Sequence, residues 1–560
     1  MKTLITSIFL IFATISSIAQ TLSREIKVEN QDRYLNFPVA GWSSDFEGEQ
    51  QMMRIIHDGT VLDEFSISLA AGDADWWAFF PVENFRGETI TVEVDDPSGK
   101  NGLNQVFSDA EFPGSDQLYN ERYRQQVHFS SRRGWNNDPN GLIWYEGEWH
   151  LFYQHNPYGW AWGNMHWGHA VSTDLVHWRE LPDALYSPDH DHMAFSGGAM
   201  VDPENTAGFR RNGVDPLIAT YTRTGSGEHL ALSYDNGRTF EEYEGNPVVE
   251  HRGRDPKVFW YEPGNHWVMI VYSESHTREL ASGEEVRLYQ HSIYTSSNLK
   301  EWTYQSGVTN FFECPELFEL PVRGEPGASK WVMYDADGKY VVGTFDGKKF
   351  NVEQGLRQFD YGGDFYASQT FANVPEEDGR RIQIGWFQTE TPYMPFNQSM
   401  TFPTELNLRK TDDGYLLYPR PIREIKKLHT RSYRLENRVI SDTTISSPIR
   451  GDQLHVIAEF DKGESTQFGL NVNGYELTYN LLRSTLNDTF YPIEETLKLE
   501  LIVDRMGIEV FVNDGELYYV EEYNSVDAEH LVEIFSRGRS SSTLQIKSFE
   551  VHELSSIWNK

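Results

Sequence analysis

A turn followed by an aromatic residue recurs along the middle of the sequence, and this repeat constrains the fold more than any other feature. The copies close at Trp178, Phe240, Trp302, Phe350 and Tyr415, and these residues lie 62, 62, 48 and 65 positions apart. Four-stranded blades of a β-propeller produce repeats of this order, roughly 40 to 50 residues plus loops. The repeat therefore predicts a five-bladed β-propeller over residues 126–428.

Outside the repeat, apolar and polar residues alternate with period two, which indicates β-strands with one buried face. Such segments are 64–69, 88–94, 454–460, 499–503 and 508–512. They predict an N-terminal β-sandwich-like domain at 24–110 and a C-terminal β-sandwich at 430–555. Residues 97–116 are rich in Gly, Ser, Asn and Asp, a composition typical of a linker. The predicted fold class is all-β.

The first residues have the pattern of a secretory signal peptide. A charged head, Met1-Lys2, is followed by an apolar run from Leu4 to Ile15 and by small residues up to Ala19. The apolar run is too short to span a bilayer, and no later segment reaches about 18 consecutive apolar residues. We therefore expect an exported protein, periplasmic or extracellular, that is cleaved near Ala19 and does not insert into a membrane.

Charge and cysteine content exclude several classes of function. The chain has 84 Asp and Glu against 48 Lys and Arg, a formal net charge of −36. Nucleic acids and anionic membrane surfaces require a basic face, so neither is an expected partner. One Cys excludes a disulfide framework and a cysteine zinc cluster. Because 14% of the residues are aromatic, we expect a neutral polar ligand, and a sugar is the first candidate.

Acidic residues stand at matching positions of the predicted blades. The first strand of each blade lines the central channel of a propeller, so matching positions converge at one end of its axis. These positions carry Asp138, Ser196, Asp255, Glu313 and Asp364. Facing carboxylates in a partly dry pocket cannot all ionise, and the resulting acid and nucleophile suit glycosidic cleavage. The alternative is that Asp138 and Asp255 cap turns beside proline, as Asp often does in loops.

Aromatic residues support a sugar ligand. Seven of the 16 Trp residues fall within 135–178, and most are expected to pack between blades. Trp160 and Trp162 lie in a Gly-flanked loop, where we expect both rings to be exposed and to stack on sugar rings. Hydrogen bonds to sugar hydroxyls are expected from Asn137, Gln154 and Ser196.

Three motifs in a fixed order make the chain recognisable. They are Trp135-Asn136-Asn137-Asp138-Pro139-Asn140-Gly141, Arg254-Asp255-Pro256 and Glu313-Cys314-Pro315. Together they resemble glycoside hydrolase family 32, the β-fructofuranosidases, which include invertases, inulinases and levanases. Supporting matches are residues 152–157, 167–170, 195–198 and 364–367. The resemblance covers about residues 126–555.

The resemblance implies a role for each matching residue. Asp138 would be the nucleophile, Glu313 the general acid and then the base, and Asp255 the stabiliser of the transition state. The family retains configuration, so Asp138 and Glu313 should lie on the order of 5–5.5 Å apart. No metal or organic cofactor is implied. The residues that would contact the substrate are Trp135, Asn137, Gln154, Trp162, Phe195, Ser196, Arg254 and Trp386.

The sequence departs from the family pattern in two places. Asn136 stands where the first motif usually has Met, which would change the polarity beside the nucleophile without removing a catalytic group. The N-terminal domain is absent from simple invertases and resembles a leading domain of levanase- and inulinase-like bacterial enzymes. Cys314 follows the expected acid, and we interpret it as small, polarizable packing and not as a nucleophile.

The leading hypothesis is exo-acting, retaining hydrolysis of β-fructans such as levan or inulin, with release of fructose. An endo-levanase and a sucrose-preferring invertase are the alternatives within the class. A non-catalytic carbohydrate-binding propeller is the alternative from another class. The three carboxylates in the ordered motifs make a non-catalytic propeller the less favoured alternative, because a binding module does not need an acid and a nucleophile. A fructan or fructo-oligosaccharide is thus the expected ligand, and the sequence identifies no protein partner.

Overall fold

The computed structural model describes residues 21–42, 50–95, 101–187, 189–280, 282, 285–539 and 541–558. The regular structure in these ranges consists of β-strands and short 3₁₀ helices, which confirms the predicted all-β class. The predicted signal peptide, residues 1–19, lies outside them. None of the helices in the described ranges is long and apolar enough to cross a membrane. The 3₁₀ helices are η1 (Glu83–Phe85), η2 (Asn101–Gln105), η3 (Ser115–Gln117), η4 (Glu262–Gly264) and η5 (Arg423–Leu428).

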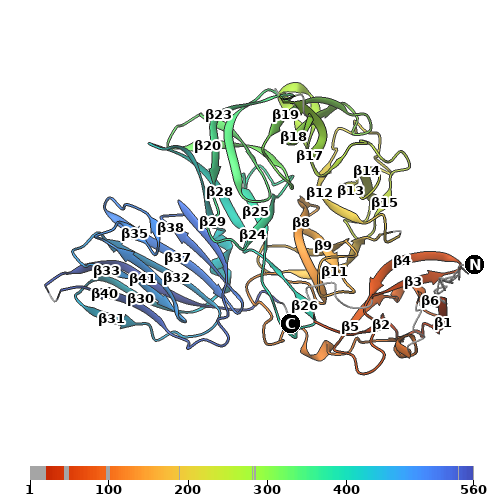
Figure 1. The fold of residues 1–560 in the computed structure, drawn as a ribbon, viewed down its shortest axis with the longest axis horizontal. Helices are drawn as coiled ribbons and strands as arrows, with labels where there is room; N and C mark the ends of the chain where they lie inside the picture. Colours follow the sequence, from red (N-terminus) through yellow and green to blue (C-terminus); the bar gives the residue numbers. More distant parts are fainter. Residues whose placement is uncertain are drawn as a thin grey trace, which may run out of the picture.

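The propeller lies at the centre of the molecule, with the C-terminal sandwich on one side and the N-terminal domain on the other (Figure 1). The N-terminal domain packs two antiparallel sheets over an apolar cluster that includes Phe37, Ile55 and Phe65. One sheet has the order β1 (Thr21–Lys27), β6 (Thr89–Asp95), β3 (Gln51–His57) and β4 (Thr60–Ile67). The other has the order β5 (Trp76–Pro81), β2 (Tyr34–Val39) and β7 (Phe107–Asp109).

Strand β7 corrects the prediction of a linker at 97–116. It pairs with β2 through Asn36 and Phe107, and the Phe107 ring packs edge-on against Trp77 at 5.4 Å between centroids. The buried side chain of Val106 precedes this strand. Residues 101–109 therefore belong to the N-terminal domain, because Val106 and Phe107 add a short edge strand to its second sheet, whereas residues 97–100 lie outside the described residues.

The first three sheets of the propeller follow one another along the chain. The first has the order β11 (Arg179–Leu185), β10 (His166–Ser172), β9 (Glu148–Asn156), β8 (Gly134–Tyr145) and β26 (Phe396–Asn397). The second contains β12 (Ala194–Val201), β13 (Leu217–Arg223), β14 (Gly227–Ser233) and β15 (Glu241–Glu242). The third contains β16 (Gly253–Tyr261), β17 (His266–Glu279), β18 (Glu285–Ser296) and β19 (Thr303–Thr309).

The remainder of the propeller is a nine-stranded sheet with two antiparallel groups. The first group is β20 (Glu316–Arg323), β21 (Ser329–Tyr334), β22 (Lys339–Phe345) and β23 (Phe350–Gln358). The second group is β24 (Phe365–Thr370), β25 (Arg381–Phe387), β27 (Ser399–Met400), β28 (Thr404–Thr411) and β29 (Gly414–Pro421). A short parallel pairing of β20 with β28, at Val322 and Arg323, joins the two groups. The five predicted blades would correspond to the first three sheets and these two groups.

The repeat turns have a common local cause. Asp174, Asp235, Asn298 and Asp346 each use one side-chain oxygen to accept hydrogen bonds from two backbone N–H groups further along the turn. At Asp174, Asn298 and Asp346 the donors lie two and three residues on, as in an Asx turn, and at Asp235 they lie three and four residues on. Both arrangements need only neighbouring residues. The four turns join the third and fourth strands of their groups, β10 to β11, β14 to β15, β18 to β19 and β22 to β23. The repeat is thus a set of matching strand connections.

The C-terminal sandwich packs two six-stranded sheets over a second apolar cluster. One sheet contains β30 (His429–Ile440), β41 (Leu544–Leu554), β32 (Leu454–Asp461), β37 (Thr496–Asp504), β38 (Gly507–Val512) and β39 (Leu517–Glu522). The other contains β31 (Thr443–Ser446), β40 (Val532–Arg537), β33 (Gln467–Val472), β34 (Tyr475–Asn480), β35 (Thr485–Leu486) and β36 (Thr489–Phe490).

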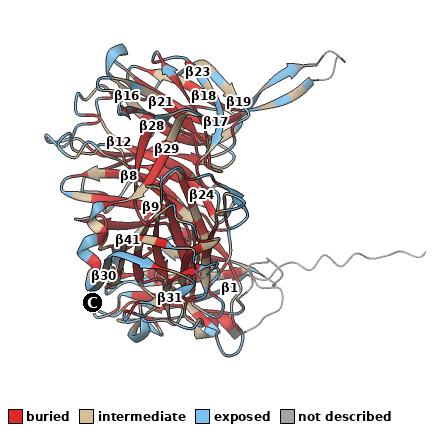
Figure 2. Ribbon diagram, turned by 90° about the vertical axis from the view of Figure 1, so that its left-hand side faces the viewer, coloured by how far each residue is buried: buried red, intermediate tan, exposed pale blue. Residues whose placement is uncertain are grey.

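The last described residues return to the propeller. The Trp558 ring stacks on Tyr119 at 4.1 Å between centroids, and its indole nitrogen donates to the Gln125 carbonyl. Figure 2 shows buried residues in the strands of both domains, and Phe511, Tyr518 and Val520 of the sandwich belong to the same apolar cluster as residues of the propeller. The C-terminal sandwich is therefore packed directly against the propeller.

Candidate active site

Two cavities lie near the inner strands of the propeller. The larger, of about 510 Å³, is lined by later residues of these strands, among them Met200 on β12, Lys257 on β16 and Glu316 on β20. Earlier residues line the smaller cavity, of about 330 Å³: Ser196 on β12, Arg254 on β16, and Glu313 just before β20. The cavities therefore occupy opposite ends of the same strands.

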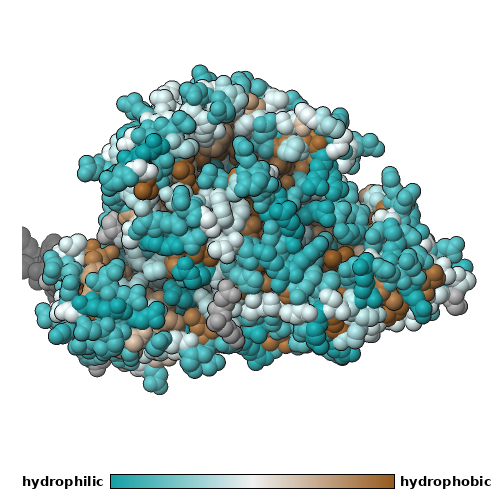
Figure 3. Space-filling model, turned by 180° about the vertical axis from the view of Figure 1, so that it is seen from behind, coloured by the Kyte–Doolittle hydropathy of each residue, from teal (hydrophilic) through white to brown (hydrophobic). Residues whose placement is uncertain are grey.

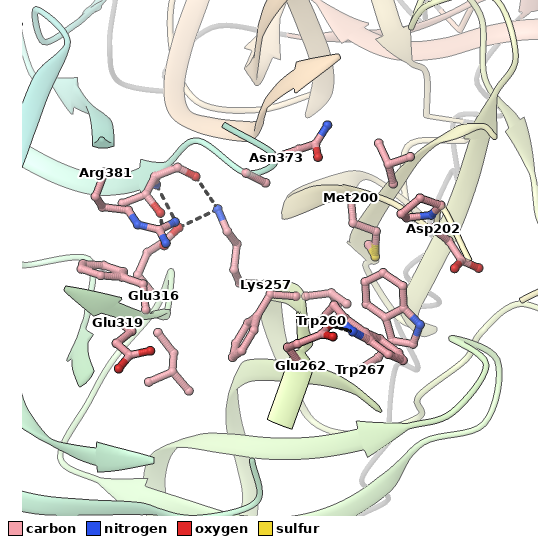
Figure 4. Close-up of a pocket in the computed structure, with 18 of the residues that line it drawn as sticks. Met200, Asp202, Lys257, Trp260, Glu262, Trp267, Glu316, Glu319, Asn373 and Arg381 are labelled. Atoms are coloured by element: carbon pink, nitrogen blue, oxygen red, sulfur yellow. Dashed lines mark hydrogen bonds and ion pairs between the residues drawn. The ribbon is translucent and has the colours of Figure 1, made fainter. Parts of the chain in front are cut away.

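The lysine and the neighbouring carboxylate at the centre of the larger cavity, Lys257 and Glu316, already have partners (Figure 4). Lys257 Nζ lies 2.8 Å from Glu316 Oε1 and donates to the Thr370 carbonyl at 2.7 Å. Glu316 also accepts hydrogen bonds from the backbone N–H and hydroxyl of Thr370. This carboxylate is neutralised by a lysine and serves to join β16, β20 and β24. The larger cavity is therefore the weaker candidate for acid–base chemistry, despite its size.

The smaller cavity collects ten of the eleven predicted site residues. Its lining is Asn137, Asp138, Gln154, Trp162, Phe195, Ser196, Arg254, Asp255, Glu313, Tyr366 and Trp386. Three carboxylates thus meet in one space, contributed by β8, β16 and the segment before β20. Among the described residues, no three His, Cys, Asp or Glu side chains are arranged to hold a metal ion.

β-Bulges turn the functional side chains into this cavity. The pairing register shifts between Asn136 and Pro139 on β8, between Ala194 and Gly197 on β12, and between Arg254 and Lys257 on β16. Each bulge contains predicted site residues, and bulges commonly re-aim a side chain beside an active site. Proline follows Asp138 and Asp255, and because proline lacks an N–H it is tolerated where a ladder is interrupted.

Left-handed backbone accompanies two of these positions. Asp255 has φ of +65° and Cys314 has φ of +47°. Non-glycine residues rarely adopt this region, and such conformations cluster at functional sites. The Asp255 backbone N–H donates to Thr222 Oγ1 at 2.9 Å, and the Cys314 N–H donates to Asp255 Oδ2 at 3.2 Å. These bonds hold the backbone of both residues in this conformation, with the Asp255 carboxylate at the cavity wall and Cys314 behind it.

Asp138 accepts short hydrogen bonds from two side chains, and the Cys314 thiol donates to it over a longer distance. Ser196 Oγ donates to Oδ2 at 2.6 Å, and Asn137 Nδ2 donates to Oδ1 at 3.0 Å. Burial raises the pKa of Asp138, and the charge of Glu313 adds to this, whereas the two donors oppose the rise. The hydroxyl of Ser196, predicted to bind a sugar, therefore also stabilises the ionised form of Asp138.

Glu313 has a cationic and a phenolic partner. Arg254 Nε donates to Oε1 at 3.0 Å, and a second guanidinium nitrogen reaches the same oxygen. Tyr366 Oη donates to Oε2 at 2.8 Å. The guanidinium carbon of Arg254 lies 4.8 Å from the centre of the Tyr272 ring, which supports the side chain from behind. Both oxygens of Glu313 are thereby oriented before any ligand binds.

Asp255 and Cys314 lie behind these groups. Burial and the charge of Glu313 raise the pKa of Asp255 well above its ordinary value, against the opposing charge of Arg254. Cys314 Sγ lies 3.6 Å from Asp138 Oδ2 and 3.7 Å from Asp255 Oδ2, so a single sulfur separates the two carboxylates. Cys314 is only 2% exposed and packs with Ala336 and Ala367, as expected for a packing residue.

The structure places three other predicted residues away from the cavity lining. Trp135 lies one layer behind, where its indole nitrogen donates to Asn137 Oδ1 at 3.0 Å and its ring packs on Trp386. Trp160 is 7% exposed and belongs to the core of the N-terminal domain, which corrects the prediction of an exposed ring. Asp364 accepts a hydrogen bond from the Glu522 N–H in the C-terminal sandwich, so it is not part of the carboxylate cluster.

Tyr366 is the site residue that sequence reasoning missed. It lies two residues after Asp364, in the same supporting motif. Successive side chains of a strand point to opposite faces, but residues two apart share a face only while the strand is regular. Here β24 begins at Phe365, after Asp364, and the register shifts after Tyr366. The sequence signal that could have identified it is its place within the supporting match at 364–367.

Comparison with known protein families decides the assignment. Residues 128–421 match the model of the glycosyl hydrolases family 32 N-terminal domain, and residues 424–553 match that of the family 32 C-terminal domain. The chain belongs to glycosyl hydrolase family 32. This family-32 protein is therefore a glycosidase, which agrees with the carboxylates in its cavity.

Similar proteins support the same assignment. A levanase of Bacillus subtilis is 37% identical over 79% of this chain and 72% of its own length. An extracellular exo-inulinase of Aspergillus niger is 29% identical over 79% of this chain and 96% of its own. Among solved structures, exo-inulinase from Aspergillus awamori has a TM-score of 0.68 at 27% identity, covering 79% of this family-32 chain and 100% of its own. A Schwanniomyces occidentalis fructofuranosidase in complex with fructose has a TM-score of 0.69 at 27% identity, over 78% and 99%.

Proposed function

We propose that this glycosidase hydrolyses β-fructofuranosidic linkages of fructans, acts from the chain end and retains configuration. The observation that carries the proposal is the convergence of Asp138, Asp255 and Glu313 on one cavity that also contains the Trp162 and Trp386 rings. Carboxylates supply the acid and nucleophile for glycosidic cleavage, and aromatic rings stack on sugars. The names of the similar levanase and exo-inulinases support fructan as the substrate class.

In the first chemical step, Asp138 attacks the anomeric carbon of the terminal fructosyl unit. Glu313 gives its proton to the glycosidic oxygen, the bond from that oxygen to the anomeric carbon breaks, and a fructosyl ester of Asp138 forms. Asp255 stabilises the positive charge that develops on the ring. Arg254 and Tyr366 donate to the two oxygens of Glu313 and so hold the side chain in position for the proton transfer.

In the second step, water replaces the leaving group. Glu313 takes a proton from the water, the hydroxide oxygen bonds to the anomeric carbon, and Asp138 leaves as a carboxylate. Two displacements at one carbon return the original configuration. Ser196 and Asn137 stabilise the Asp138 carboxylate before and after the cycle, because they donate to its two oxygens.

Substitution of the two central carboxylates tests this mechanism. We expect Asp138→Asn and Glu313→Gln to lower kcat by about 10³-fold or more while the melting temperature changes little. Asp364→Asn is the matched control, since this carboxylate bonds to the C-terminal sandwich outside the cavity. Undiminished fructose release by either active-site variant would rule out the assigned roles.

Product analysis tests the exo mode and the linkage. A cavity of about 330 Å³ suits a chain end better than an internal chain segment. We expect fructose as the only early product from levan or inulin by chromatography, and methyl β-fructofuranoside in the presence of methanol, because configuration is retained. A ladder of oligosaccharides would instead identify an endo-levanase, and a strong preference for sucrose would identify an invertase.

We also propose that the protein is exported. The basis is the signal-peptide pattern of residues 1–19, together with a similar inulinase that is named extracellular. N-terminal sequencing of the protein secreted by its producing cells should begin at or near Gln20.

A further inference from the structure

The loop between β9 and β10, residues 157–165, carries Trp162 to the cavity and also contacts the N-terminal domain. Trp162 is 40% exposed, lines the cavity and packs edge-on against Phe195 at 5.8 Å between centroids. Trp160, two residues earlier, packs in the apolar cluster of the N-terminal domain, and its indole nitrogen donates to the Met394 and Phe396 carbonyls of the propeller. One short loop therefore links a wall of the cavity to a domain that lies outside the propeller.

A single buried carboxylate of the N-terminal domain contacts residues at both ends of this loop. Asp63, on β4, is fully buried. Its Oδ2 accepts a hydrogen bond from Tyr158 Oη at 2.6 Å, and its Oδ1 lies 3.0 Å from His166 Nε2. Tyr158 and His166 precede and follow Trp162 in the sequence. Asp63 thus fixes the separation of the two loop ends.

Further contacts between β4 and the loop act in the same direction. Asn164 Oδ1 accepts from the Ser66 N–H, and Asn164 Nδ2 donates to the Ser66 carbonyl, both at 2.8 Å. The ring of Phe65 stacks on Tyr158 with 3.5 Å between centroids. These contacts are buried, so the N-terminal domain helps to fix the position of the loop, together with the bonds of Trp160 to the propeller.

The contact between Asp63 and His166 is a fully buried ion pair. Burial alone would lower the pKa of His166, but the carboxylate of Asp63 raises it to about 9. His166 is therefore protonated near neutral pH. Removal of one member of a buried pair leaves the other charge uncompensated, which is costly. The loop ends should consequently shift when the Asp63 charge is removed.

The propeller shapes the loop but does not replace these contacts. Asn156, at the end of β9, donates to the Ala161 carbonyl at 2.8 Å and accepts from Asn164 Nδ2 at 3.0 Å. These bonds maintain the turn inside the loop. The contacts of Asp63, by contrast, connect the loop to the N-terminal domain. They therefore influence the position of the Trp162 ring at the cavity.

We propose that Asp63 is a positioning residue that holds Trp162 in the substrate-binding cavity, and that the N-terminal domain is thereby a functional part of the binding site. The inference rests on the proposed function, because it concerns affinity for the fructan chain end. If the Trp162 ring moved, the three carboxylates of the cavity would remain in place, because other strands hold them. The proposal therefore concerns KM and not kcat.

A double-mutant cycle on the full chain tests the proposal, with levan and inulin as substrates. We expect Asp63→Asn to raise KM about three- to tenfold, the range of an aromatic contact, with kcat within about twofold. In a Trp162→Ala background the same change should raise KM less than about twofold further, since the contact that it positions is already absent. A purely structural role of Asp63 would raise KM equally in both backgrounds, and that result overturns the proposal.

Two further variants keep the test interpretable. Asp32→Asn is the matched control: Asp32 is also buried in the N-terminal domain, but its carboxylate bonds to Glu29 N and Ser108 Oγ within that domain. It should leave KM unchanged. If Asp63→Asn does not fold, Tyr158→Phe removes only the hydroxyl donor and should show the same background-dependent rise in KM. If the wild type releases no fructose from any fructan, the proposed function fails; if it does and the two backgrounds respond equally, only the role of Asp63 fails.

Discussion

At the scale of single residues, the ionisation of Asp138 depends on a balance between burial and two donors. Burial and the charge of Glu313 favour the protonated form, whereas Ser196 and Asn137 favour the carboxylate. A nucleophile must be ionised, so the activity should fall as the pH drops through the pKa of Asp138. The acidic limb of the pH–rate profile therefore reports these contacts directly.

Removal of the Ser196 hydroxyl should shift the acidic limb of the pH–rate profile to higher pH. In Ser196→Ala the carboxylate loses the hydrogen bond of 2.6 Å, and its pKa should rise further, because a hydrogen bond to the charged form stabilises that form. The acidic limb of kcat/KM should then shift to higher pH by the same amount. The pH–rate profile of the wild type is the reference, and an unchanged acidic limb contradicts this reading of Asp138.

Cys314 gives a second prediction at this scale. Burial, together with the charges of Asp255 and Asp138, raises the pKa of its thiol well above the ordinary value. A thiol that is neither ionised nor exposed does not react with alkylating agents. We expect iodoacetamide at about pH 8 to leave the activity of the native enzyme unchanged, and to label Cys314 only after unfolding in guanidinium. Rapid inactivation of the folded enzyme would show that the sulfur is accessible.

At the scale of elements, His128 joins the segment before β8 to the C-terminal sandwich. It is fully buried, with Nδ1 3.0 Å from Asp504 on β37 and Nε2 2.9 Å from Glu509 on β38. Although burial alone would lower the pKa of His128, these carboxylates raise it to about 9. Because this value exceeds the unfolded value of 6.5, the contribution to stability is complete below about pH 6.5 and is lost as the pH rises through about 9.

Substitution of His128 should therefore destabilise the enzyme in a pH-dependent way. His128→Ala leaves two buried carboxylates without their cation, which costs about 3 to 5 kcal/mol near pH 6. The loss should be smaller at about pH 9.5, where the wild type has itself lost the charge of His128. Thermal unfolding of both proteins at the two pH values measures the difference. His177→Ala, which removes a partly exposed partner of Asp174 within one repeat turn, is the control. An equal loss at both pH values would contradict the ion pair.

At the scale of the whole molecule, the acidic charge lies mainly outside the cavity. The formal net charge is −36, and the face shown in Figure 3 is largely hydrophilic with scattered hydrophobic residues. Such a charge steers charged ligands, but a fructan is neutral. For the proposed substrates we therefore expect kcat/KM to change less than about twofold between about 50 mM and 500 mM NaCl. A steep dependence on salt, measured with levan or inulin, would indicate that surface charge takes part in binding.

Much of the fold was predictable because its signals are local. An Asx turn such as that at Asp174 or Asn298 needs only the next few residues, and strand alternation reports one buried face. The matching positions of Asp138, Asp255 and Glu313 were predictable for a related reason: equivalent strands of a propeller deliver equivalent residues to one end of the axis.

The errors lie where residues distant in the sequence meet. Trp160 is buried because the N-terminal domain, about a hundred residues earlier, covers it, and Asp364 bonds to Glu522 in the C-terminal sandwich. Neither contact can be predicted from the residues next to Trp160 or Asp364 in the sequence. Tyr366 was missed for a similar reason, because the start of a strand and a bulge decide which side chain of a motif faces the cavity.

The sequence by itself determined the all-β architecture, the family and the carboxylates that meet in the cavity, because periodicity, turn chemistry and ordered motifs are written along the chain. Only the tertiary structure decided which of two cavities holds them, since the larger one contains a carboxylate already neutralised by Lys257. It also decided that Asp63 reaches the loop of Trp162 from another domain. The physical reason is that the burial, pairing and desolvation of a side chain depend on which surfaces contact each other in the folded protein. A local sequence pattern does not specify those contacts.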